Sequence, residues 1–338
     1  MKKRFDIMTF TIMISVFFYS CTCNQNKEEK FLTELKDTTV KITFNRYEKS
    51  LFTLKKEDLQ NELKRIKPQY GFFLEGDLDD PQNIEQIRSY LNDPQMIENY
   101  TSCQEKFADV TNLEKQLSSS LTYFKYYFPD KKIPEVFTYV CGMDYEHPVI
   151  YADSVLLIAL DMYLGSEYPL YQGLALPLFM RKTMSEEYIV RDCMKAMAEY
   201  YCYQEMKDAS CLDQMIYEGK KMYFIDAMTP EISDTIKFKY SKKQLDWCYQ
   251  NEAQMWAFFI DNKLLYSKDN LTYRKFFNEA PFTTSFSKDS PPRTGSWIGW
   301  RIVSAYMKNH KSINFTQLIQ ADNSQEILTQ SRYKPKKP

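Results

Sequence analysis

A glutamate lies in the middle of an apolar stripe on a predicted helix in the C-terminal third of the sequence. The residues that share this stripe with Glu252 are Leu245, Cys248, Tyr249, Met255, Trp256 and Phe259. A carboxylate on a core-facing surface must be paired, neutralised or used in chemistry, because an unpaired buried charge is costly. Further along the chain, Arg293 and Arg301 flank two tryptophans in a segment that opens another helix. We expect one of these arginines to form a buried ion pair with Glu252, and a ligand-binding role is the alternative.

Two further features of the same half could contribute to such a site. Glu218 lies near the end of a predicted helix and is followed by a glycine, and its ordinary interpretation is an exposed side chain. Gly295 and Gly299 would let the helix that carries Trp297 approach a neighbouring helix closely. The candidate structural or binding polar cluster therefore consists of Glu218, Glu252, Arg293, Trp297 and Arg301.

Other kinds of chemistry find little support in the composition. The chain has only two histidines, His147 and His310, and neither belongs to an HExxH motif. It contains no GxSxG motif and no CxxC motif, and its 8 glycines leave little material for phosphate-binding loops. A net charge of −1 disfavours nucleic acid as a partner. We therefore predict no metal, no cofactor and no catalytic residue, so the chain is not expected to be an enzyme.

The N-terminus has the pattern of a lipoprotein signal peptide. A cationic start is followed by an uncharged, mostly apolar run over residues 7–19 and by Ser20-Cys21. This run is shorter than the roughly 20 residues that a membrane-spanning helix needs. We predict a signal peptide over residues 1–20, lipid attachment at Cys21 and a tether over residues 21–35, with Cys23 as the competing attachment site. The mature protein would then lie in the cell envelope, periplasmic or on the surface, and disulfide formation among the seven other cysteines stays open.

The remaining chain is predicted to fold as one domain over residues 36–338, of the α+β class, mainly helical with a small sheet. Strands are expected from residue 40, where apolar and polar residues alternate, and at Glu135–Cys141 and Ser154–Leu160. The most regular helical pattern covers Val110–Phe128, and almost everything after Met180 has helical spacing, including Ile189–Lys207. No linker long enough to separate two domains interrupts this region.

Several segments resemble the family of gliding motility-associated lipoproteins called GldB. They are SVLLIALDMYLGSEYPLY at 154–171, MIYEGKKMYFIDAMTP at 215–230, the 240–267 segment, the 281–307 segment and the terminal ILTQSRYKP. The resemblance implies a location in the cell envelope and an association with the gliding and type IX secretion machinery.

A more distant resemblance concerns the zinc peptidases of the HExxH type. Glu218-Gly219 and the Gly295 to Trp300 segment are similar to their glutamate-glycine helix and to a glycine-rich terminal helix. The helix that would carry HExxH, however, reads IVRDCMKAMAEYYCYQEMK over 189–207 and contains no histidine. This resemblance implies a zincin-like fold that has lost its metal site.

These observations favour a non-catalytic, membrane-anchored lipoprotein that acts through protein partners in the envelope. Two alternatives remain at this level: a metal-independent envelope hydrolase that uses Glu218 and Glu252, and a small-ligand binder with a cleft around Glu252 and Arg301.

Overall fold

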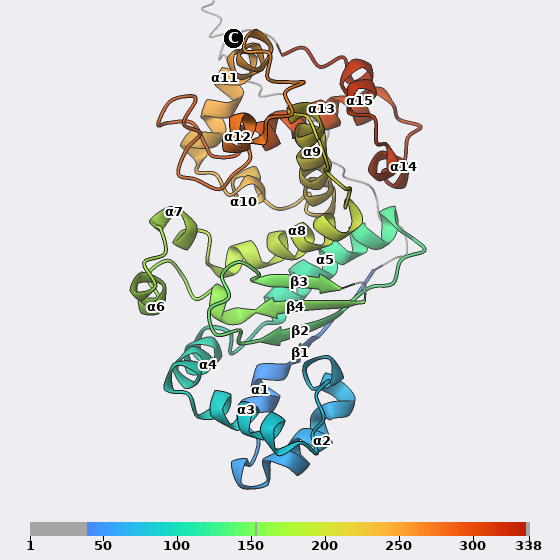
Figure 1. Ribbon diagram of the computed structural model, residues 1–338. Helices are drawn as coiled ribbons and strands as arrows, with labels where there is room; N and C mark the ends of the chain where they lie inside the picture. Colours follow the sequence, from blue (N-terminus) through green and yellow to red (C-terminus); the bar gives the residue numbers. More distant parts are fainter. Residues whose placement is uncertain (1–38, 153, 336–338) are drawn as a thin grey trace, which may run out of the picture.

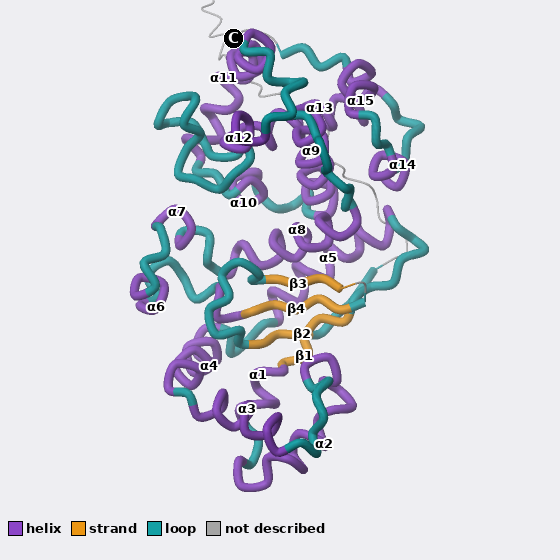
Figure 2. Tube along the Cα trace, viewed as in Figure 1, coloured by secondary structure: helices purple, strands orange, loops and turns teal. Residues whose placement is uncertain are grey.

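A small mixed sheet lies near the middle of the molecule (Figures 1 and 2). The computed structural model describes residues 39–152 and 154–335. The strand order is β1-β2-β4-β3, where β1 pairs with β2 and β2 with β4 in parallel, while β3 is antiparallel to β4. The strands are β1 (Phe44–Arg46), β2 (Glu135–Tyr139), β3 (Val149–Ala152) and β4 (Val155–Ala159).

The helices fall into an N-terminal and a C-terminal group. The N-terminal group comprises α1 (Tyr47–Phe52), α2 (Leu59–Tyr70), α3 (Pro81–Asn92), α4 (Pro94–Lys106) and α5 (Thr111–Tyr127). The C-terminal group comprises α6 (Pro169–Gly173), α7 (Leu178–Arg181), α8 (Ile189–Tyr201), α9 (Cys211–Met228), α10 (Asp234–Phe238), α11 (Lys242–Asp261), α12 (Asn270–Tyr273), α13 (Thr294–Asn309), α14 (Phe315–Gln320) and α15 (Ser324–Ser331).

The two faces of the sheet belong to two separate hydrophobic cores, because successive residues of a strand point to opposite faces. Val136 and Leu156 are paired across β2 and β4 and join the large core made with α5, α8, α9 and α13. Their neighbours Phe137 and Leu157, also paired, join the smaller core made with α1, α2 and α3. The sheet is therefore covered by helices on both sides, as Figure 1 shows.

The alternating segment at residues 40–46 forms a strand only at its end. Before β1 the chain lies along α5, where the backbone N–H groups of Val40, Ile42 and Phe44 donate to side chains on that helix. The acceptors are Thr122, Ser118 and Glu114, which are four residues apart and so share one helix face. The alternation of apolar and polar residues in this segment is explained by an extended chain that bonds to one face of a helix. The longer strand predicted from residue 40 is therefore wrong.

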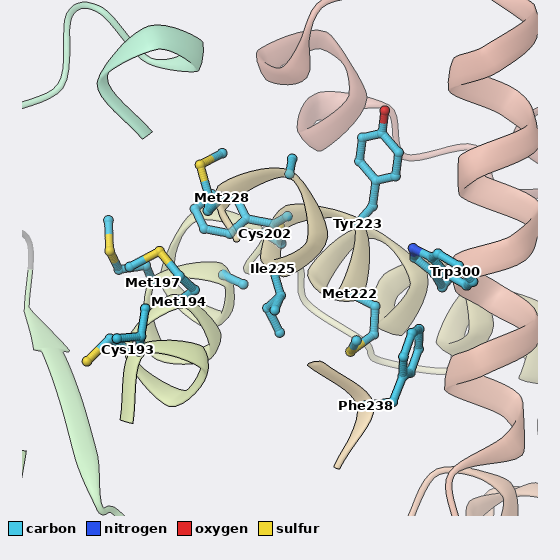
Figure 3. Close-up of a cluster of buried hydrophobic side chains, with 14 of the residues drawn as sticks. Cys193, Met194, Met197, Cys202, Met222, Tyr223, Ile225, Met228, Phe238 and Trp300 are labelled. Carbon is cyan, nitrogen blue, oxygen red and sulfur yellow. The ribbon is translucent and has the colours of Figure 1, made fainter. Parts of the chain in front are cut away.

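Helices α8, α9 and α13 form the centre of the C-terminal half. In Figure 3, Met194 and Met197 of α8 lie near Met228 of α9, and Met222 of α9 lies near Trp300 of α13. The prediction that the segment around 189–207 is helical is confirmed as far as Tyr201, where α8 ends. The strands β2 and β4 confirm the predictions at 135–141 and 154–160, whereas β3 was missed between them.

The six cysteines within the described residues, Cys103, Cys141, Cys193, Cys202, Cys211 and Cys248, are all free thiols. No helix in the part of the chain that the structure describes is long and apolar enough to cross a membrane. The predicted signal peptide, Cys21 and the tether lie outside the described residues.

Candidate functional site

A groove with a volume of about 1160 Å³ is the main candidate site. Its walls come from residues 145–149, from α7 and the chain after it, from α8, from the 239–244 segment after α10, and from the 279–292 loop region. In Figure 1, α7 and α10 flank the end of α8 on this side of the molecule. The volume exceeds the roughly 300–1,000 Å³ that is typical of pockets for small ligands.

Asp192 of α8 lies at the floor of this groove and is surrounded by donors. Arg191 Nη1 donates to its Oδ1 over 2.9 Å, and Lys239 Nζ donates to its Oδ2 over 3.0 Å. The hydroxyl of Tyr163 donates to Oδ2 as well, over 3.0 Å. Burial would raise the pKa of the Asp192 carboxyl, but Lys239 and Arg191 together hold it below its usual value. Asp192 is therefore a buried, fully engaged carboxylate.

Lys239 at the floor and Arg293 beside it both have a left-handed backbone conformation. Lys239 follows α10 with φ 54°, and Arg293 precedes α13 with φ 53°. This conformation costs most side chains roughly 1–2 kcal/mol, so it persists only where the surrounding packing imposes it. Arg293 Nε lies 3.3 Å from Glu279 Oε2, and the charge of Arg293 helps to lower the pKa of that carboxyl against the opposing effect of burial.

The wall at residues 145–149 is positioned by a second buried carboxylate. Asp161 accepts hydrogen bonds from the backbone N–H groups of Cys141 and Gly142, both over 3.0 Å. Gly142 and Met143 then turn the chain with φ values of 74° and 81°. Burial raises the pKa of the Asp161 carboxyl although these hydrogen bonds lower it. Asp161 thus joins the end of β4 to the turn after β2 that leads into residues 145–149.

The residues that the sequence singled out divide between two places. Glu252 Oε1 accepts from Arg301 Nε over 2.9 Å and from the hydroxyl of Tyr333 over 2.8 Å. The guanidinium of Arg301 lies 5.6 Å from the ring centre of Trp297, which is completely buried. Trp297, Glu252 and Arg301 therefore belong to the contact between α11 and α13, and they do not line the groove.

Arg293 and Glu218 lie elsewhere. Arg293 pairs with Glu279 beside the floor of the groove, and Glu218 of α9 pairs with Lys221 over 2.8 Å. The charges of Glu279 and Glu218 both raise the pKa of Arg293 although burial lowers it. Glu218 and Arg293 thus interact electrostatically, whereas Glu252 and Arg301 form a separate pair.

No group of three or more His, Cys, Asp or Glu side chains that could hold a metal ion occurs among residues 39–152 and 154–335. The comparison with protein families gives one match, in which the model of the gliding motility protein GldB covers residues 28–335. The chain belongs to the GldB family. No curated protein and no solved structure matches it. Membership in the GldB family indicates a gliding motility-associated lipoprotein with a membrane-anchored location in the envelope.

Sequence reasoning missed the polar floor in this member of the GldB family. Asp192 and Arg191 lie in a stretch of α8 whose neighbours Val190 and Cys193 are buried. The rule that singled out Glu252, a charge among apolar helix positions, applies equally to Asp192 and could have found it. Lys239 and Glu279 carry no comparable signal, because only the fold brings their loops to α8.

Proposed function

We propose that this GldB-family chain is a non-catalytic accessory lipoprotein of the cell envelope, anchored through Cys21, whose groove binds a protein partner of the gliding or secretion machinery. The observation that carries the proposal is the state of the groove floor. Asp192 is held by Arg191, Lys239 and Tyr163, so its lone pairs and charge are already engaged. A general base or nucleophile needs an available lone pair near the substrate, which an engaged carboxylate of lowered pKa supplies poorly.

The zincin-like character is part of the same proposal. Arg191, Asp192 and Lys195 stand at positions i, i+1 and i+4 of α8, the spacing of HExxH, and all three line the groove. Helix α8 packs along β3, the antiparallel edge strand of the sheet. Guanidinium and ammonium groups at the two histidine positions would repel a zinc ion, since zinc ligands must offer a lone pair. These features support a zincin-like domain whose metal site has become a cationic binding floor.

The hydrolase alternative has less support from the geometry. It requires Glu218 and Glu252 to act on one substrate, but Glu218 is paired with Lys221 and Glu252 with Arg301 in different parts of the molecule. The binder alternative placed a cleft around Glu252 and Arg301, but these side chains are 12% and 20% exposed and pair with each other, and Trp297 beside them is completely buried.

The proposal can be tested by site-specific photo-crosslinking in the bacterium that encodes the chain. A crosslinking residue at Leu178, which is exposed on the groove wall, should give discrete adducts with envelope proteins. The matched control is Leu271, which is also exposed but does not line the groove. Equal adduct patterns from both positions would contradict a partner in the groove. Turnover of an envelope peptide or glycan by the purified full chain, lost on Asp192→Asn, would contradict the non-catalytic role.

A further inference from the structure

The groove lining carries more positive than negative charge, although the whole chain has a net charge of −1. Six cationic and five anionic side chains line it, and Arg293 adds another positive charge directly behind Glu279. The cations are Lys182, Arg191, Lys195, Lys239, Lys243 and Lys288, and the anions are Glu146, Asp192, Glu199, Glu279 and Asp289.

The excess of positive charge is concentrated at the floor. Arg191 and Lys239 both pair there with a single carboxylate, that of Asp192. The side chains of Arg191 and Asp192 are 3% and 6% exposed, so water screens their charges poorly. This group of three thus holds two positive charges and one negative charge. Because an uncompensated charge in such surroundings is costly, the floor favours an incoming anion.

Lys239 is the cation best placed to receive that anion. Its side chain is 18% exposed and lines the groove, and within the described residues its ammonium donates a hydrogen bond only to Asp192. An ammonium has three N–H donors, so donors remain for a ligand. Burial lowers the pKa of the Lys239 amine more than Asp192 raises it, which agrees with an ammonium whose charge is incompletely compensated.

Cationic side chains also lie at the mouth of the groove. Lys182, which follows α7, and Lys288, in the 279–292 loop region, are exposed and have no ion-pair partner among residues 39–152 and 154–335, whereas Lys195 and Lys243 are paired with Glu199 and Asp289. Aromatic side chains also line the groove, among them Tyr145, Phe179, Tyr188 and Tyr240. Aromatic rings beside polar and charged groups suit an extended peptide chain.

We propose that the groove binds an extended acidic peptide segment, one of whose carboxylates accepts hydrogen bonds from Lys239. This inference rests on the proposed function, because it assigns the chemistry of the partner segment that the groove takes. The carboxylate that reaches Lys239 can belong to an Asp or Glu side chain or to a C-terminus, and the experiment below separates these sources. The exposed cations at the mouth, Lys182 and Lys288, would attract further acidic residues of the same segment.

The test is calorimetric titration of the purified full-length protein in detergent with three hexapeptides at low ionic strength. The first is acetylated and amidated Ala-Tyr-Glu-Ala-Glu-Ala, the second carries Gln for both Glu, and the third is the Gln peptide with a free C-terminal carboxylate. We expect the Glu peptide to bind at least about tenfold more tightly than the amidated Gln peptide, with a preference that weakens as salt is added. Tighter binding of the third peptide would assign the site to a C-terminus.

Lys239→Gly is the decisive variant, because glycine adopts the left-handed backbone of this position without strain and Asp192 still accepts from Arg191 and Tyr163, and urea denaturation checks that the variant is folded. It should remove the preference for Glu over Gln. The double variant Lys182→Gln, Lys288→Gln, in which both positions are exposed, should reduce the preference for the Glu peptide. The matched control is Lys242→Gln, since Lys242 is 81% exposed next to Lys243 but does not line the groove.

Equal binding of the Glu and Gln peptides, or a preference that survives Lys239→Gly, would overturn this inference. Complete displacement of the peptide by an equal concentration of inorganic phosphate would also overturn it, because the site would then take any oxyanion. If the crosslinks from Leu178 are present while the Glu preference is absent, the proposed function stands and only the acidic peptide is wrong. If the crosslinks are absent as well, both fail.

Discussion

Gly219 of α9 and Gly299 of α13 bring two helix backbones into direct contact. A Cβ atom on Gly219 would overlap the backbone carbonyl of Gly299, and a Cβ atom on Gly299 would overlap the carbonyl oxygen of Met215. The two helices make the most extensive contact between any two elements of the fold. This helix crossing holds α9, which carries Glu218, against α13, which follows Arg293.

We expect Gly219→Ala and Gly299→Ala each to lower the free energy of unfolding by roughly 3 kcal/mol or more, at the upper end of what overpacking costs, because backbone atoms cannot move aside. Urea denaturation of each variant measures this loss. The control is Gly71→Ala, since nothing lies within 4 Å of a Cβ atom at Gly71. If all three substitutions had the same effect, the close approach of the helices would not matter for stability.

A second prediction concerns the pair of Glu252 and Arg301, whose side chains are 12% and 20% exposed. Arg301→Met should lower the free energy of unfolding by about 3 kcal/mol, because within the described residues the largely buried Glu252 carboxylate then keeps only the hydroxyl of Tyr333 as a donor. Replacing both Glu252 and Arg301 by Met should come much closer to the wild-type value. A double-mutant cycle, in which urea denaturation gives the free energy of unfolding of each variant, separates the interaction energy of the pair from the cost of each single substitution.

The same variants show whether Glu252 and Arg301 stabilise the fold or bind a partner. A structural pair predicts that Arg301→Met protein which remains folded still gives the crosslinks from Leu178. An unchanged denaturation midpoint combined with lost crosslinks would instead place a partner site at Glu252.

The sequence predicted that Glu252 pairs with Arg293 or Arg301, and that Gly295 and Gly299 allow a close helix contact, for one reason: each depends on a local pattern. Glu252 interrupts an apolar stripe, and Gly295 and Gly299 are rare small residues on an aromatic helix, so the pattern itself indicates burial. The helices and the central strands β2 and β4 follow from periodicity in the same way. Short β3 was missed because four residues after a proline, with mixed exposure, do not form a distinguishable period.

The groove floor could not be predicted to the same extent. Asp192 is detectable as a charge on an apolar helix, but its partner Lys239 is 47 residues away and follows a helix of 5 residues. The pairing depends on where α10 is placed by the packing of α9, which no local pattern encodes. Glu218, Glu252, Arg293, Trp297 and Arg301 do not form one cluster for a related reason: they come from α9, α11, α13 and the residue before α13, and only the packing of these helices determines which side chains meet.

A third prediction follows from the buried tyrosines. Burial raises the pKa values of the Tyr163, Tyr171 and Tyr240 hydroxyls far above the unfolded value of about 10. A raised folded-state pKa contributes stability that is fully present below the unfolded pKa and is lost as the pH rises above it. The urea midpoint should therefore fall steeply between about pH 10 and about pH 12. Tyr240→Phe should show a shallower fall, and an identical fall in this variant would show that other groups govern alkaline unfolding.

A fourth prediction concerns the anchor, which the family membership supports at the level of a lipoprotein. Cys21→Ala should leave the protein unprocessed or release it from the membrane fraction, because the thiol that carries the lipid is removed. Metabolic labelling with a fatty-acid analogue and membrane fractionation measure this. Cys23→Ala is the matched control and should remain acylated and membrane-bound. Acylated, cleaved Cys21→Ala protein would assign the lipid to Cys23.

The last prediction is that the purified full chain binds no stoichiometric zinc and shows no zinc-dependent peptidase activity. In the proposed zincin-like arrangement, Arg191 and Lys195 of α8 would take the places of the two histidines, and Asp192 between them already accepts from Arg191 and Lys239. A zinc ion placed there would meet cationic donors instead of imidazole lone pairs, and its own charge would be repelled by Arg293 as well. Elemental analysis after dialysis against a weak chelator measures the metal content. One tightly held zinc per chain, lost in Asp192→Asn with Glu218→Gln but retained in the surface control Glu57→Gln, would show that the cationic floor still holds a metal and would refute the degenerate site.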